Sequence, residues 1–210
     1  VSADLSNPKE SATDILANIR ATVMPDILAK YPYLKPLYEG QNREAAKVGA
    51  SAGKVLPIVF FLIYGIIAFT FRSYSQPIIL LLLVPFSMIG VAWGHFIHDF
   101  QINILSWLGI IALIGIMVND GLVLIGKFNI YLREGMPYRE ALISAGRSRF
   151  RAIFLTSLTT IAGLAPLIFE TSRQAQFLIP MAISISYGIG IATFLTLFML
   201  PIFLSLVNYM

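Results

Sequence analysis

The sequence has no cysteine among its 210 residues, which excludes disulfide frameworks, thiolate metal sites and cysteine nucleophiles. It also contains no glycine-rich phosphate loop, no G-x-S-x-G turn and no H-E-x-x-H motif. An enzyme built on any of these motifs is therefore not expected. Neither a cofactor nor a metal site is predicted, and any transport by this chain would have to run on an ion gradient.

Charge is scarce as well. Charged residues make up 12% of the chain, whereas a soluble domain typically has about 25%. Hydrophobic residues reach 57%, and the mean hydropathy is +0.78. The net charge of +4 does not indicate nucleic-acid binding, because basic residues are grouped beside apolar runs. This composition is typical of a membrane protein.

Five apolar segments follow one another after residue 50, and their interiors contain no lysine or arginine. Each is long enough to cross a hydrocarbon core of about 30 Å, which takes roughly 17–25 helical residues. We expect an all-α membrane protein with five transmembrane helices. The predicted spans are 55–71, 77–97, 102–126, 152–169 and 177–207.

Residues 1–50 differ in composition and are expected to form a small α+β segment outside the membrane domain of 51–210. Asn7, Pro8 and Glu10 have the spacing of a helix start, and Pro25 should kink or end that helix. A short strand and turn is predicted at 34–40. From Gln41 onward we expect a helix that continues into the first span.

The loop at 127–151 sets the predicted topology. It contains six arginine or lysine residues against two glutamates, so it should remain cytoplasmic. Residues 1–50 then lie outside the cytoplasm and the C-terminus inside. Within this loop, 138–145 is expected to form a short amphipathic helix on the inner membrane face, the alternative being a plain connector. Because residue 1 is Val and no signal peptide precedes a segment placed outside, we expect a fragment of a longer protein.

The stretch IMVNDGLVL at 116–124 places two polar residues inside an apolar span. Asp120 is the only acidic residue in the interior of any span, and such a residue costs about 2.5–3.5 kcal/mol on insertion scales. A proton or ion site is one interpretation. The structural alternative is a protonated carboxyl that donates a hydrogen bond between helices.

Hydroxyl groups on the following span lie at a similar depth. Asp120 is seven residues from Lys127, which is about 10 Å along a helix. The two spans are antiparallel, so hydroxyls five to nine residues past Arg151 reach the same level and form a candidate polar cluster. They belong to Thr156, Ser157, Thr159 and Thr160. The alternative is that each hydroxyl bonds only to its own helix backbone.

Several longer stretches extend the pattern over nearly the whole chain. They are YEGQNREAA at 38–46, FRSYSQPIILLLLVPFSMIG at 71–90, LSWLGIIALIGIMVNDGLVLI at 105–125, RFRAIFLTSLTTIAGLAPLIF at 149–169 and QAQFLIPMAISISYGIGIATFLTLFMLPIFL at 174–204. Together they resemble the second half of an RND (resistance–nodulation–division) efflux transporter, of the type that exports hydrophobic and amphiphilic compounds. In that resemblance the five spans are the last five of twelve helices, and 1–50 is the end of a periplasmic porter domain.

The resemblance implies a proton-driven antiporter of the bacterial inner membrane, usually a homotrimer. Such transporters work with a periplasmic adaptor protein and an outer-membrane channel, and they are built from two repeats. This chain would supply most of one repeat and would depend on the missing N-terminal half. The resemblance identifies no substrate-binding residue here.

The same resemblance suggests a proton relay made of Asp120, Asn119, Thr156, Thr160, Thr159 and Ser157. Many members of the family have a lysine at the position of Asn119 and an asparagine at the position of Asp120. The charge of that lysine is therefore absent here. Either Asp120 itself carries protons, or it tunes aspartates on the missing half.

Other classes stay open from the sequence. A heavy-metal exporter of the same family is one. A membrane module similar to protein-export or sterol-sensing proteins is another, because those proteins share this arrangement of helices without exporting drugs.

Overall fold

The computed structural model describes residues 12–36, 41–172, 175 and 178–209. The chain divides into two compact units, Val1–Val59 and Phe60–Met210. The helix α3 (Gln41–Phe71) begins in the first unit and ends in the second. The predicted helix start at Asn7 lies outside the described residues.

The first unit contains two short helices, α1 (Ala12–Thr22) and α2 (Met24–Lys30), separated at Val23. Pro25 lies in the first turn of α2, where its missing N–H has no helical partner to lose. The predicted break at this proline is therefore present, and the proline begins a new helix. Residues 41–50, predicted to be helical, form the first part of α3.

The predicted α+β character of this segment is wrong for the residues that the structure describes, because none of them forms a strand. Residues 34–36 of the predicted strand are irregular, and 37–40 lie outside the described residues. Pro32 and Pro36 lack the backbone N–H that a strand ladder needs, which accounts for the missing strand.

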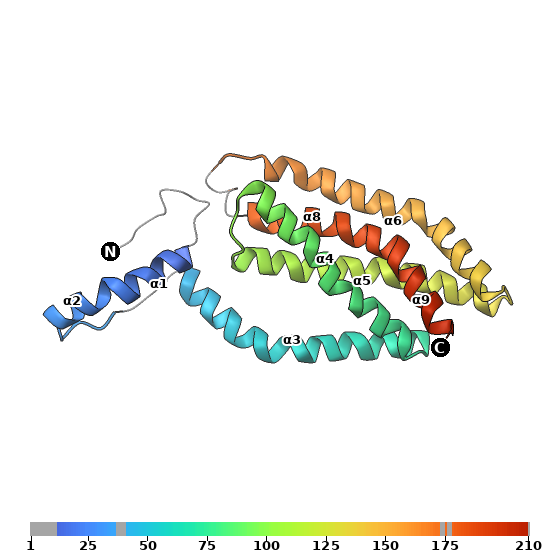
Figure 1. Cartoon of the computed structure of the whole chain (residues 1–210), viewed down its shortest axis with the longest axis horizontal. Helices are drawn as coiled ribbons and strands as arrows, with labels where there is room; N and C mark the ends of the chain where they lie inside the picture. The colour runs from blue at the N-terminus through green and yellow to red at the C-terminus, as the bar shows by residue number, and fades with distance from the viewer. Residues whose placement is uncertain (1–11, 37–40, 173–174, 176–177, 210) are drawn as a thin grey trace. The chain divides into compact units, whose positions relative to one another are not determined.

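Five helices of the described chain are long and apolar enough to cross a membrane, as the sequence predicted. Their apolar spans are Ser51–Phe71, Ser75–His98, Ile104–Arg133, Tyr138–Ile168 and Ile179–Val207. The first is the second part of α3, the next three are α4, α5 and α6, and the last comprises α8 (Ile179–Phe194), η1 (Leu195–Met199) and α9 (Leu200–Tyr209). Figure 1 shows α4, α5, α6 and α8 packed along one another in the second unit.

Local signals explain where the helices begin and end. Asn103 caps α5 (Ile104–Arg133), because its side chain accepts from the backbone N–H groups of Leu105 and Ser106. At the end of α4 (Ser75–His98), Asp99 adopts a left-handed conformation with φ of 55°. The Phe100 N–H then donates to the His95 carbonyl, which closes the helix.

The predicted short helix at 138–145 is not a separate element. It forms the first two turns of α6 (Tyr138–Ile168), which continues through Gly146 as a single helix of 31 residues. A helical glycine costs only about 1 kcal/mol relative to alanine. The residues on both sides of Gly146 favour a helix, so this cost does not end it.

Pro201 is accommodated by a π-helical segment. Proline has no N–H to donate to a carbonyl one turn earlier, and η1 lies directly before this position. There the Leu200 N–H donates to the carbonyl of Leu195, five residues back. The fifth span therefore continues past its proline without a break in the helix.

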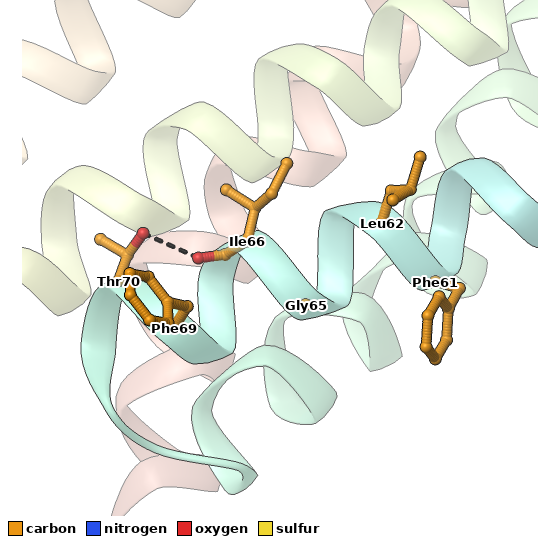
Figure 2. Close-up of a pocket in the computed structure, with 6 residues that line it drawn as sticks. All are labelled: Phe61, Leu62, Gly65, Ile66, Phe69 and Thr70. Carbon is orange, nitrogen blue, oxygen red and sulfur yellow. Dashed lines mark hydrogen bonds between the residues drawn. The ribbon is translucent and has the colours of Figure 1, made fainter.

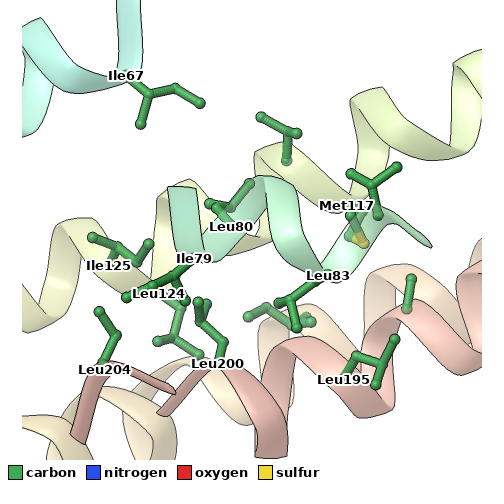
Figure 3. Close-up of a cluster of buried hydrophobic side chains, with 14 of the residues drawn as sticks. Ile67, Ile79, Leu80, Leu83, Met117, Leu124, Ile125, Leu195, Leu200 and Leu204 are labelled. Carbon is green, nitrogen blue, oxygen red and sulfur yellow. The ribbon is translucent and has the colours of Figure 1, made fainter. Parts of the chain in front are cut away.

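The apolar core of the second unit lies between α4, α5 and the last span. Figure 3 shows leucines from all three reaching toward one another, among them Leu83, Leu124 and Leu200, each at most 1% exposed. Half of the apolar window of α4 is buried, against 6% in α3 and 11% in α6. α3 and α6 therefore present most of their apolar surface outward from this chain.

One polar pair joins α4 to α5 at the end of this core near the connection between α5 and α6. Gln76 in α4 and Asn129 in α5 exchange two hydrogen bonds, because each amide N–H₂ donates to the other side-chain oxygen at 2.9 and 3.0 Å. Both side chains are half-buried. Each therefore depends on the other for its hydrogen bonds.

Removing one amide of this pair should destabilise the transporter more than removing both. We expect Gln76→Leu to lower the stability of the transporter by about 1–3 kcal/mol, since Asn129 loses its partner. The double variant Gln76→Leu/Asn129→Leu should recover most of that loss. A double-mutant cycle on thermal unfolding of the full-length protein measures this, and additive losses would contradict the pairing.

Candidate functional site

Asp120 lies on the buried stripe of α5. Leu113, Met117, Asp120 and Leu124 follow at helical spacing and are 0%, 2%, 7% and 0% exposed. Asn119, the residue directly before Asp120, is exposed. The structure therefore separates the two polar residues of IMVNDGLVL, with the acid directed into the protein and the amide directed outward.

Close contacts with α8 (Ile179–Phe194) fix what faces Asp120. A methyl group at Gly109 would lie 2.7 Å from the Met181 carbonyl oxygen, and one at Gly188 would collide with Leu113. The residue numbers rise along both helices from the first contact to the second, so α5 and α8 run parallel. Counted seven residues on from Leu113 and from Gly188, Asp120 comes level with Leu195, the first residue of η1.

Two buried hydroxyls flank that position. Thr193 is 8% exposed and Thr196 is 1% exposed. This register places hydroxyl groups of the last span at the level of the carboxylate. The sequence-based prediction did not include them, although counting depth along the fifth span, as was done for the fourth, would have identified them.

The predicted hydroxyls on α6 all bond to their own helix. Thr156 Oγ1 donates to the Ala152 carbonyl at 2.9 Å, and Thr159 and Thr160 donate to the Thr156 carbonyl at 2.9 and 2.8 Å. Thr156 and Thr159 are exposed, and Thr160 is half-buried. Their place in a proton relay stays a prediction.

Ser157 differs from these threonines because it is buried, at 4% exposure, and contacts another helix. Its Oγ donates to the Ile153 carbonyl at 3.0 Å and accepts a hydrogen bond of 2.6 Å from Thr193 Oγ1. This pair links α6 to α8 at the level of Asp120. Of the four predicted hydroxyls, Ser157 is the one that the structure joins to a neighbouring span.

The Asp120 carboxylate accepts no hydrogen bond from the described part of the chain. Among the described side chains, the fully enclosed polar atoms without a partner are Arg149 Nε and Ser186 Oγ. Since the Asp120 oxygens are not in this group, they keep some contact with the surface of the segment. The carboxylate is thus held by apolar neighbours and remains open to a proton or to a polar group from outside this chain.

A second polar cluster lies between α4 and α8, at the end of α4 where Asp99 closes the helix. Buried His95 contacts the Phe100 carbonyl and Ser184 Oγ, each at 3.0 Å, and His98 contacts the Tyr187 hydroxyl at 3.0 Å. Across the described residues, no three His, Cys, Asp or Glu side chains group closely enough to hold a metal ion. These histidines therefore connect two helices.

A shallow apolar notch lies on α3. Figure 2 shows its lining, which comes from a single helix, with Gly65 between the bulkier side chains. Its lining residues are Phe61, Leu62, Gly65, Ile66, Phe69 and Thr70. It has no charged group, and the Thr70 hydroxyl donates to the Ile66 carbonyl, so the notch provides shape without polar recognition.

Comparison with known proteins shows one family pattern over almost the whole chain. The pattern of the AcrB/AcrD/AcrF family matches residues 7–208. The chain is 28% identical over 141 residues to multidrug resistance protein MdtC of Erwinia amylovora, which covers 67% of this chain and 14% of that protein.

A second relative has a different substrate in its name. The chain is 30% identical over 161 residues to nickel-cobalt-cadmium resistance protein NccA of Alcaligenes xylosoxydans xylosoxydans, covering 77% of this chain and 15% of that protein. The chain thus spans about a sixth of the length of the curated relatives it matches.

The fold also matches a solved structure. The crystal structure of a heavy metal efflux pump superposes on 95% of this chain with a TM-score of 0.71, at 22% sequence identity. The match covers 19% of that pump. The five-span arrangement is therefore the same as in the corresponding part of that protein.

Proposed function

Because the chain belongs to the AcrB/AcrD/AcrF family of RND transporters, which are secondary transporters and not enzymes, we propose that it is part of a proton-driven efflux antiporter. The exported compounds in this proposal are drugs or other amphiphilic molecules. The observation that carries it is Asp120, a buried acid within an apolar span of a multi-pass membrane domain. A group that can bind and release a proton at this depth is what coupling to a proton gradient requires.

In the proposed mechanism, Asp120 alternates between a protonated and a charged form. Asn119, the hydroxyls of the α6 stretch at 156–160 and groups of the missing half stabilise the charged form. Protonation then changes the packing of α5 against its neighbours. The change would reach the porter segment through residues 41–56, which belong to α3.

The proposed setting is the bacterial inner membrane. The predicted basic loop at 127–151 is largely helical, because its basic residues lie in the last turns of α5 and the first half of α6. These residues still favour a cytoplasmic position, which places residues 1–50 in the periplasm and the C-terminus in the cytoplasm. The proposed assembly is a homotrimer that acts with a periplasmic adaptor and an outer-membrane channel. Within each subunit, the missing N-terminal half would provide the partner for the exposed apolar face of α3.

Export of heavy metals by the same proton-coupled mechanism is the second candidate. It is favoured by the name of the nickel, cobalt and cadmium relative and by that of the solved pump. The drug relative favours the first candidate at nearly the same identity. Family membership makes a protein-export or sterol-sensing module the weaker alternative.

Transport by the full-length protein tests the proposal. Reconstituted into proteoliposomes with an imposed proton gradient, it should move a cationic dye, and a protonophore should stop the movement. Transport of Ni²⁺ or Co²⁺ in place of the dye would favour the second candidate. Gradient-independent movement of every probe, or no movement of any, would contradict proton-driven efflux.

A further inference from the structure

A groove between α6 and η1 offers a site that the proposed transport mechanism does not use. Gly146, Arg147 and Phe150 form one wall, and Leu197 and Phe198 form the other. Its volume is about 310 Å³. It lies on the first half of α6, where the basic residues of the chain are concentrated.

The walls of the groove are apolar and exposed. Phe150 and Phe198 expose 47% and 51% of their surface. Phe150 stacks on Phe154 at 5.8 Å between ring centres, and Phe198 packs on Phe194 at 4.8 Å. These pairs extend both walls toward the middle of the membrane. Gly146 leaves open space in the wall of the groove, since a methyl group added there would have no neighbouring atom within 4 Å in the described part of the chain.

The charge around the groove has one sign. Arg147 lines it and is exposed, and Arg149 and Arg151 follow on the same helix. The wall on the last span adds no charge, because residues 178–209 contain no acidic or basic side chain. The nearest acid before the groove on α6 is Glu140, seven residues and about 10 Å before Arg147.

We propose that this groove binds an anionic phospholipid, with an acyl chain between Phe150 and Phe198 and the phosphate paired with Arg147. Basic pockets between membrane helices suit anionic headgroups, and arginine pairs with phosphate through several donors. A lipid suits this surface because the groove has apolar walls beside one exposed basic side chain, and its lining contains no acidic residue.

Lipid binding to the full-length transporter tests this assignment. Native mass spectrometry of the delipidated protein would be titrated with dioleoylphosphatidylglycerol, dioleoylphosphatidylcholine or inorganic phosphate. Arg147→Gln should weaken phosphatidylglycerol binding about fivefold and phosphatidylcholine binding less, because the choline cation of phosphatidylcholine offsets its phosphate charge. Gly146→Leu should fill the open space beside Gly146 and weaken the binding of both lipids. Millimolar inorganic phosphate should not compete with either.

Arg133→Gln is the matched control, because it removes the same charge from the same end of the domain without lining the groove. It should leave both affinities unchanged. An equal loss in this control would mean diffuse attraction to the surface and would overturn the site. Unchanged phosphatidylglycerol binding in Gly146→Leu would also overturn it, and if that variant is less stable, a protein segment occupies the groove. Full competition by inorganic phosphate would exclude the acyl-chain contact.

Discussion

Replacing Asp120 with asparagine in the full-length transporter is expected to lower proton-driven export by about 5- to 150-fold, the range of a typical coupling free energy. Asparagine has nearly the same shape but cannot bind and release a proton. Asp120 is 7% exposed on the buried stripe of α5, so a substitution of matched size should leave the packing unchanged. The measurement is transport in proteoliposomes with and without an imposed proton gradient.

The stability of the same variant separates a lost proton site from a damaged fold. The Asp120 carboxylate has no hydrogen-bond partner in the described part of the chain, and a charge at this depth costs about 2.5–3.5 kcal/mol on insertion scales. Asp120→Asn should therefore unfold at the same temperature as the parent protein or higher. Lost export together with retained stability is the combination expected.

Two further variants sharpen this test. Asp120→Glu keeps a carboxyl group and should retain part of the gradient-dependent export. Asn119→Gln changes the exposed neighbour and should have the smaller effect of the two positions. Undiminished export in Asp120→Asn would exclude Asp120 as a proton carrier. Slower export that responds to the gradient as steeply as in the parent protein would mean that Asp120 tunes acids elsewhere in the transporter.

The spans and the burial of Asp120 could be predicted from the sequence because each depends on local composition. A long apolar run specifies a membrane helix wherever it packs. A lone acid within such a run is expected to face protein or water. Both inferences need only the order of residues along one helix, and the side-chain arrangement around Asp120 agrees with them.

The partners of Asp120 could not be predicted in the same way. Depth counting identifies which residues share a level, but the rotation of each helix decides which of them face one another. Three of the four predicted hydroxyls rotate away from the core and bond to their own backbone, whereas Ser157 faces Thr193. The parallel register of α5 and α8, which places Thr193 and Thr196 level with Asp120, depends on contacts at Gly109 and Gly188.

Two other predictions, the separate helix at 138–145 and the strand at 34–38, rested on local signals of modest strength. One glycine, Gly146, is too weak to end a helix whose neighbours favour it, so α6 continues. Residues 34–36 are irregular, and Pro32 and Pro36 supply no backbone N–H for a strand ladder.

The contact between α4 and α8 should be the most sensitive to added volume. A methyl group at Gly90 would collide with the carbonyl oxygen of Tyr187 and lie 2.8 Å from Ile191 Cγ1. Backbone atoms of a packed helix cannot turn aside, so the two helices would have to separate. We expect Gly90→Ala to destabilise the transporter by about 1–3 kcal/mol, measured by thermal unfolding, although alanine is the better helix former.

Gly163 on α6 provides the control, because a methyl group there has no neighbouring atom within 4 Å in the described part of the chain, apart from its own helix. Gly163→Ala should leave stability unchanged or raise it by up to about 1 kcal/mol. Stability changes of opposite sign in Gly90→Ala and Gly163→Ala would identify steric contact, and not helix propensity, as the cause of the loss at Gly90. A loss at Gly163 equal to that at Gly90 would contradict this explanation.

Gly94 allows the steric argument to be checked on the same helix. An added methyl group there would meet the side chain of Tyr187, at 2.7 Å from Cγ and 2.8 Å from Cβ, and not its backbone. Removing that side chain, Cβ included, in Gly94→Ala/Tyr187→Gly should therefore relieve the clash, whereas Gly90→Ala/Tyr187→Gly should keep it. Both double variants lose the hydrogen bond between Tyr187 and His98, so that loss cancels when they are compared. Equal stability of the two double variants would show that close helix approach at Gly90 is not what holds α4 against α8.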